Sequence, residues 1–143
     1  MVPQKLTFSP LSRRQIEADF SGGHITSDAG VLLLREVDKQ HRLTQRLAET
    51  LTDQRDARMI RHGLNTMIRQ RVYGVASGYE DLNDHEALRF DQALQTATGN
   101  ASTLAGKSTL CRMEQAMDRQ TIVKAHELLW HHFIEQHEKP PKE

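Results

Sequence analysis

Arginines are the side chains in this sequence most able to bind an anion. Five of them lie between positions 55 and 71 together with one aspartate, and five carboxylates with one arginine follow directly, between positions 80 and 91. Guanidinium groups present a planar fork of donors that suits phosphate oxygens. Two roles are open to the basic segment: it pairs with the acidic segment, or it faces outward toward an anionic partner.

Helical periodicity gives three of these arginines a common surface. We expect a helix over residues 56–77, because apolar side chains recur along it at the helical period. Arg58, Arg61 and Arg69 then lie on its polar side. We predict that these three residues contact DNA phosphates and that Arg112, on a later helix, provides a second contact. The alternative is a solvated helix face, since the chain has 19 basic and 19 acidic side chains.

Arg71 breaks this pattern, because it falls inside the apolar stripe of the same helix. A buried charge without a partner is strongly destabilising. We therefore predict a structural ion pair between Arg71 and Asp81, Asp84 or Asp91, which are close in sequence and opposite in charge. These three carboxylates are also the residue type that binds Mg²⁺, but a solvated turn is the commoner role of such a cluster.

The sequence offers little for other chemistries. Its one cysteine, Cys111, excludes an intrachain disulfide and the paired thiolates of zinc fingers, and it suits a reducing compartment. The densest histidine cluster, at positions 126–137, does not place two imidazoles four residues apart on a helix. The glycines match neither a phosphate-binding loop nor a dinucleotide fingerprint. We expect no metal site and no cofactor in this chain.

The elements that position the arginines are mainly helical. We expect an irregular arm over residues 1–14, and then a strand over 15–20 that enters a hairpin through Gly22-Gly23. Helices follow at the spacings of the apolar residues, with Ser108 and Asp118 as N-caps of the last two. We expect one helix over about residues 29–40 and a short helix that begins at residue 43. A long helix follows over 56–77, and one or two helical turns begin at residue 85. The last two helices are expected to begin at residues 108 and 118.

Length and composition suit one domain. The chain has 143 residues, of which 37% are apolar, and this is enough for a modest core. The N-terminus lacks a signal-peptide pattern, and the longest aliphatic run, over residues 31–34, is too short to span a bilayer. We expect a soluble, cytoplasmic protein without a membrane partner.

Six blocks of the sequence, taken in order, resemble a known family. They are Thr26–Asp38, Ile60–His62, Arg69–Tyr73, Gly78–Asp84, Leu88–Asp91 and Ser108–Glu114. Together they look like the N-terminal region of bacterial insertion-sequence transposases of the DDE group 1 type, over roughly residues 16–142. A small departure is Ala29, where the family usually has glycine.

The resemblance implies a protein of DNA transposition. Such transposases bind the terminal inverted repeats of their element, and they cut and join DNA with three carboxylates that hold two divalent metal ions, usually Mg²⁺, on an RNase H-like fold. The family's first catalytic aspartate follows a basic, proline-containing linker, which corresponds here to residues 139–143. We therefore assign no catalytic residue and expect no DNA cleavage by this chain alone.

The expected organisation follows from the same comparison. Residues 15–138 would be the helical N-terminal domain of a truncated transposase, without the RNase H-like core, and residues 139–143 a linker toward the catalytic domain. The expected partners are terminal-repeat DNA and either the catalytic domain or a second transposase protomer. The alternative is a helical protein–protein interaction domain that makes no direct contact with DNA.

Overall fold

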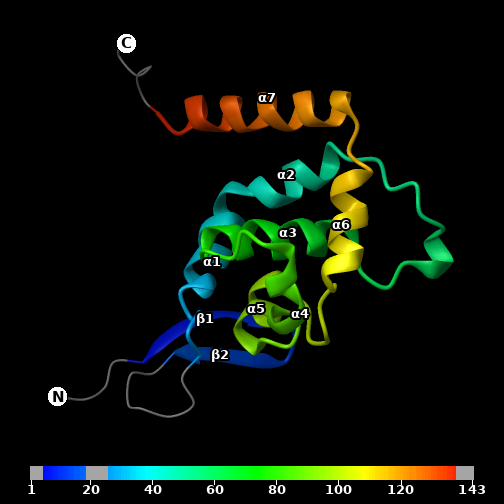
Figure 1. Cartoon of the computed structure of the whole chain (residues 1–143). Helices are drawn as coiled ribbons and strands as arrows, with labels where there is room; N and C mark the ends of the chain where they lie inside the picture. Colours follow the sequence, from blue (N-terminus) through cyan, green and yellow to red (C-terminus); the bar gives the residue numbers. More distant parts are fainter. Residues whose placement is uncertain (1–4, 19–25, 138–143) are drawn as a thin grey trace.

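The computed structural model describes residues 5–18 and 26–137 (Figure 1). Within them a helical body carries one N-terminal β-hairpin, which confirms the expected fold class. The elements are β1 (Leu6–Leu11), β2 (Arg14–Ala18), α1 (Val31–His41), α2 (Leu43–Glu49), η1 (Ala57–Met59), α3 (Leu64–Ala76), η2 (Leu82–Asp84), α4 (His85–Leu88), α5 (Gln92–Thr98), α6 (Lys107–Gln115) and α7 (Arg119–Glu135). No helix in these residues is long and apolar enough to cross a membrane.

The hairpin lies earlier in the chain than the sequence predicts. Strand β1 lies within the expected irregular arm and pairs antiparallel with β2, with Leu6 opposite Ala18. Pro10 is tolerated because each strand of a two-stranded sheet has a free edge, and the register is irregular between Phe8 and Leu11. The predicted Gly22-Gly23 turn lies outside the described residues.

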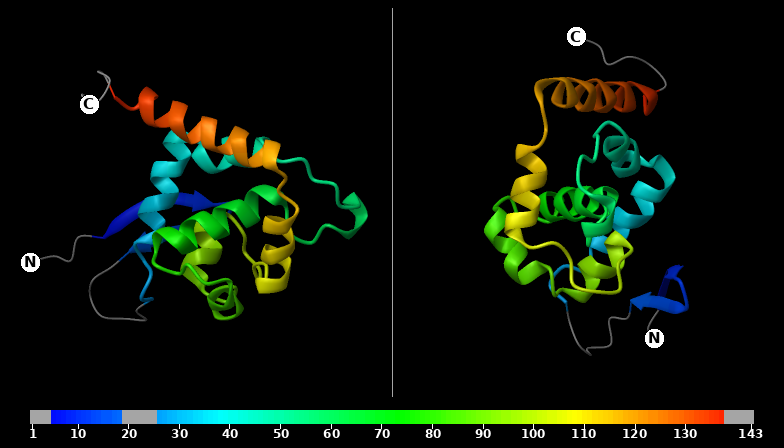
Figure 2. Two further views of the ribbon diagram at one scale, coloured as in Figure 1. Left: turned by 45° about the horizontal axis from the view of Figure 1, so that its top comes forward. Right: turned by 90° about the vertical axis from the view of Figure 1, so that its right-hand side faces the viewer.

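Helix α3 runs through the centre of the molecule and joins two apolar clusters (Figure 2). Tyr73 on α3 packs in the first cluster with side chains of α1, α4 and α5, and Phe8 and Ile16 of the hairpin lie against it. Met67 and Ile68 pack in the second cluster with Leu110 and Met113 of α6. Burial on both sides makes α3 the element that positions α6 relative to α1 and α2.

A buried carboxylate ties α1, α2 and α3 together. Asp38 is 8% exposed and accepts hydrogen bonds from the Thr44 backbone N–H at 2.9 Å, from the Thr44 hydroxyl and from the Tyr73 hydroxyl at 2.9 Å. The Arg69 guanidinium lies 3.6 Å away and supplies the opposite charge. Burial, and then the negative charge of Asp38, raises the pKa of Tyr73, so its hydroxyl stays a donor.

A second buried node fixes the segment that leads into α6. The Gln70 side-chain amide donates to the Ala105 carbonyl at 2.7 Å and accepts from the Ala105 N–H at 3.1 Å. It also lies 3.2 Å from Nδ1 of His85, which is fully buried. Gly74 makes room for this imidazole, because a Cβ there would lie 2.9 Å from its Cε1.

Helix α5 is missing from the sequence-based expectation. Asp91 accepts from the Leu94 N–H at 2.7 Å and caps its first turn, and Gly99 ends it at a φ of 81°. The helix has only seven residues, so its two apolar turns are too short to give a recognisable period.

Candidate nucleic-acid interface

The segment between α2 and α3 is an extended arm rather than a helix. We call residues 52–62 the arm; it reaches away from the helical body, with η1 near its tip (Figure 1). The helix expected from residue 56 begins only at Leu64, after Gly63. Asp56 caps the single 3₁₀ turn of η1 by accepting from the Arg58 N–H, and this local bond competes with a longer helix.

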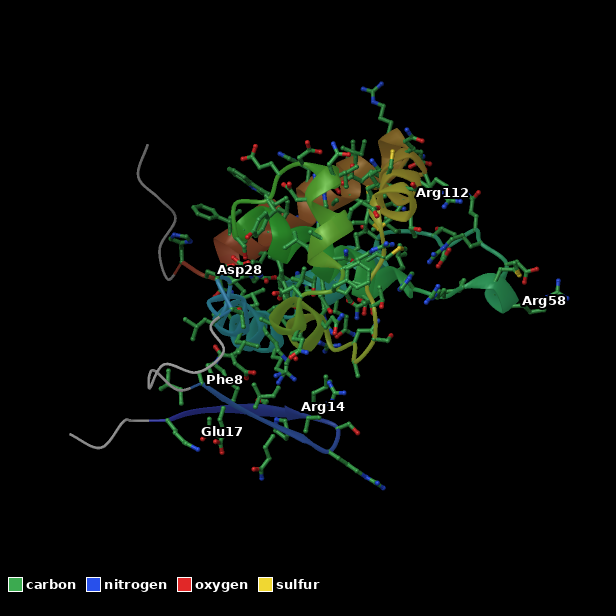
Figure 3. The ribbon with its side chains drawn as sticks, turned by 60° about the horizontal axis from the view of Figure 1, so that its bottom comes forward. Phe8, Arg14, Glu17, Asp28, Arg58 and Arg112 are labelled. Atoms are coloured by element: carbon green, nitrogen blue, oxygen red, sulfur yellow. The ribbon has the colours of Figure 1, made fainter. Side chains whose placement is uncertain are left out.

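Two Asp-x-Arg pairs shape the arm. The Asp53 carboxylate accepts hydrogen bonds from the backbone N–H of Arg55 and from its guanidinium, with Nη2 at 2.6 Å. The Asp56 carboxylate accepts the same two bonds from Arg58, with Nη2 at 2.8 Å. The arginine bonds lower the pKa of both aspartates, so both are ionised at neutral pH. Arg58 nevertheless stays 87% exposed at the tip (Figure 3).

An open groove of about 1030 Å³ separates the arm from α6 and the start of α7. Its lining is mixed, with apolar side chains such as Leu64, Met67 and Met117 at the floor and polar and charged groups around them. Four arginines line it, from the arm, from the residue after α4 and from α6: Arg55, Arg61, Arg89 and Arg112.

Two of these arginines have no acidic partner in the described part of the chain. Arg61 is exposed on the arm side, and Arg112 is exposed on α6, where its Nε donates to the Ser108 carbonyl at 3.0 Å. No carboxylate of the described residues pairs with Arg61 or Arg112, and the two guanidiniums lie at two walls of one groove. Both were candidate DNA contacts from the sequence, and the structure brings them to the same groove.

The three carboxylates that line the groove are each held by another group. Asp53 is paired with Arg55, and the Asp118 carboxylate accepts from the Thr121 N–H at the start of α7. Glu86 accepts from the Lys107 N–H at 2.9 Å and lies 3.5 Å from Arg89. The Glu86 carboxylate thus occupies the N-terminus of α6, which leaves the arginines as the anion-binding groups of the groove.

Arg69 lies elsewhere, which corrects the expectation of one surface for Arg58, Arg61 and Arg69. It is on α3, where its Nε donates to the Thr44 hydroxyl at 3.3 Å and faces Asp38. The error comes from extending the helical period through the arm. Arg69 stabilises the packing of α1 and α2 on α3 and does not line the groove.

Arg71 has an acidic partner, but not one of those predicted. Its Nε bonds Glu114 of α6 at 2.7 Å, and its other nitrogens donate to the carbonyls of Tyr79 and Glu80. Asp81 and Asp91 cap η2 and α5, so backbone N–H groups take the acceptors that the prediction assigned to Arg71. Asp84 also forms no ion pair with Arg71 among the described contacts.

Sequence reasoning did not single out Arg55, Arg89 or His62 as groove residues. His62 is half-buried, its Nδ1 has no hydrogen-bond partner in the described structure, and burial followed by the charge of Arg61 lowers its pKa. Its imidazole is therefore neutral at neutral pH. Arg89 lies over the Phe90 ring, 4.7 Å from its centre. The one available signal was the run of arginines itself, which includes Arg55.

The described residues do not fit the metal site that the resemblance implies. No three of their His, Cys, Asp or Glu side chains lie together in a group that could hold a metal ion. Asp81 and Asp91 are engaged at helix N-termini, so these carboxylates do not converge. We derive no metal-dependent step from this chain.

Comparison with known proteins gives one finding. No curated protein and no solved structure matches the chain. A family model described as "Transposase DDE domain group 1" matches residues 8–143, which is nearly the whole sequence. The chain therefore belongs to the transposase DDE domain group 1 family.

Proposed function

We propose that this chain binds DNA for an insertion-sequence transposase and that the groove between the arm and α6 is the contact surface. The DNA would be the terminal inverted repeats of the element. The observation that carries the proposal is the placement of Arg61 and Arg112, two guanidiniums without acidic partners in the described chain, on the lining of one groove. Arg58 at the arm tip would add a contact to a neighbouring phosphate.

The charge balance of the chain favours a local contact surface over a basic coat. The formal net charge is +0, so long-range attraction to DNA is weak and binding depends on where the free cations lie. Phosphate contacts of this kind position a protein on a duplex without reading its bases. These arginines would therefore contribute to DNA affinity, and other residues would have to recognise the bases.

The test is DNA binding by the full chain, measured as fluorescence anisotropy of a labelled duplex over a series of salt concentrations. The double variant Arg61→Gln/Arg112→Gln should weaken binding to every duplex tested. The slope of log K against log salt should shrink by up to about 1.8, at about 0.9 for each lost phosphate contact.

The matched control removes two exposed arginines outside the groove. Arg13 lies in the turn between β1 and β2, Arg14 begins β2, and neither lines the groove. Figure 3 shows Arg14 far from Arg112 of α6. Arg13→Gln/Arg14→Gln should leave affinity and slope close to those of the unmodified chain. Equal losses in the two double variants would show a nonspecific charge effect, and no salt-dependent binding by the unmodified chain would favour the alternative, an interaction domain without DNA contact.

A further inference from the structure

The apolar floor of the groove is the part of this surface that phosphate contacts do not explain. Arginines at the walls can hold a DNA backbone, whose charged phosphates gain nothing from an apolar floor. Every methionine of the sequence except Met1 nevertheless lines the groove: Met59, Met67, Met113 and Met117. A thioether is flexible and polarisable, and it packs favourably against an aromatic ring. The floor is therefore suited to a flat ring rather than to a charged group.

Two of the apolar side chains that line the groove are open to an incoming ring. Met59 on the arm is 81% exposed, and Phe90, which follows α4 and Arg89, is 58% exposed. The Arg89 guanidinium lies over the Phe90 ring, and this cation–π contact holds the ring at the groove. Aromatic rings and arginines are the side chains on which bases stack in proteins that bind single-stranded nucleic acid.

Two polar atoms of groove-lining residues also lack partners. Nδ1 of His62 and Nε of Arg89 are buried and have no hydrogen bond within the described part of the chain. Buried polar atoms are nearly always bonded, so each of these two needs an explanation. Both side chains are only partly buried, and a rotation can turn either atom toward a bound ligand. The edge of a nucleobase carries the donors and acceptors that such atoms require.

We propose that the groove holds an unpaired base of the DNA, with the base on the methionine floor beside Phe90 and its phosphate at Arg61 or Arg112. This inference rests on the proposed function, because the same arginines fix the backbone. The groove, at about 1030 Å³, is as large as the larger ligand pockets of proteins, which reach about 1,000 Å³. A paired base shows a protein only its edges, so a base must be unpaired, as in a single-stranded tail, to lay its face on the floor.

The primary test compares two labelled duplexes with the same short single-stranded tail, one with bases and one with abasic residues. Both tails carry the same phosphates, so a purely electrostatic contact does not distinguish them. The unmodified chain should bind the tail with bases about 5- to 150-fold more tightly, the effect of stacking one base on a protein side chain. The slope of log K against log salt should be the same for both duplexes.

The result separates this inference from the proposed function. Equal affinity for the two tails, lowered in both cases by Arg61→Gln/Arg112→Gln, would overturn the base site and leave the phosphate contacts standing. Absence of salt-dependent binding to either duplex would overturn both.

Variants locate the base within the groove. Met59→Ser/Phe90→Ser should bind the two tails equally well, with the salt slope and circular dichroism of the unmodified chain, because both side chains are largely exposed. Leu33→Ser/Val37→Ser is the matched control: it removes apolar side chains of α1 that are 60% and 54% exposed and do not line the groove, and it should keep the preference. A preference that survives the groove substitutions, or that is lost equally in the control, would overturn the assignment.

A fluorescent base tests the contact directly. 2-Aminopurine placed in the tail should become less accessible to acrylamide when the chain binds, and Met59→Ser/Phe90→Ser should restore its accessibility. Deoxyadenosine monophosphate tests the other source of the same chemistry, a free nucleotide. It should compete weakly with the tail, because it lacks the remaining backbone contacts. Saturable binding of the free nucleotide, without any gain in affinity from the bases of the tail, would overturn the assignment of the groove to DNA.

Discussion

The Asp38 carboxylate is the residue that holds three helices to one another. It accepts from Thr44 of α2 and Tyr73 of α3 and faces Arg69, so its loss leaves the buried Tyr73 hydroxyl without its acceptor and the half-buried Arg69 guanidinium without its opposite charge. Asp38→Ala should lower the free energy of unfolding by about 3 to 5 kcal/mol, the usual cost of breaking a buried pair from one side.

Urea unfolding followed by circular dichroism measures that loss. Asp56→Ala is the control, because it breaks a comparable Asp–Arg pair on the exposed arm, where solvent screens the interaction. The control should unfold at the same urea concentration as the unmodified chain. An Asp38→Ala variant as stable as the control would show that the buried node does not stabilise the fold.

His85 makes stability depend on pH near neutrality. Burial, and then the charge of Arg71, lowers its pKa, so the unfolded chain binds more protons and stability falls as pH drops below about 6.5. The free energy of unfolding should decrease between about pH 7.5 and about pH 5.5, by at most about 1.4 kcal/mol per pH unit for this group. His85→Gln should flatten the profile; an unchanged slope would contradict this role.

The Arg71 pair shows what residue-level reasoning can and cannot give. The helical period correctly indicates that Arg71 needs an acidic partner, because its side chain is only 21% exposed and its Nε bonds Glu114. It does not identify Glu114, which is 43 residues away and reaches α3 only because Leu110 and Met113 pack on Met67 and Ile68. The prediction chose carboxylates that are near Arg71 in sequence, and two of them, Asp81 and Asp91, instead cap η2 and α5.

Among the elements, the existence of most helices was predictable, but their start signals were only partly right: Ser108, an expected N-cap, lies inside α6, whose N-cap is Gly106. Asp118 accepts from the Thr121 N–H and begins α7, as the sequence indicates, and the helix expected over 29–40 corresponds to α1. The arm was not predictable from apolar period alone. The carboxylates of Asp53 and Asp56 bond the backbone N–H groups of Arg55 and Arg58. These local bonds compete with helix formation, although Ile60 and Leu64 have helical spacing.

The same pairs predict how the arm affects DNA affinity. Asp53→Asn/Asp56→Asn removes two negative charges beside Arg55 and Arg58 while keeping side chains of similar shape. Under the proposed function, affinity for duplex DNA should rise and the salt slope should steepen, as two more guanidiniums become free to contact phosphates.

Glu17→Gln/Glu80→Gln is the matched control for the arm variant. It removes two negative charges from residues that do not line the groove. This control should change the affinity for DNA much less, because salt screens the interaction between two charges that lie more than about 10 Å apart. An arm variant that binds no better than this control would place the arm outside the DNA contact.

At the scale of the whole molecule, distant parts of the chain form the groove. The groove joins the arm to α6, elements about fifty residues apart in sequence, because the arm leads directly into α3 and α6 packs on α3. That juxtaposition depends on the buried Gln70–Ala105 bonds and could not be predicted from local patterns. The mainly helical class and the presence of an N-terminal hairpin could be predicted, because they follow from periodicity and composition.

Site-directed photocross-linking tests the groove contact most directly. A benzophenone amino acid at Ser108, which is exposed and lines the groove, should attach covalently to a labelled duplex on irradiation, and the yield should fall as salt rises. The same group at Leu33 on α1, exposed but outside the groove, should give little product. Equal yields at the two positions, or product only at Leu33, would contradict the assignment of the groove as the DNA-binding surface.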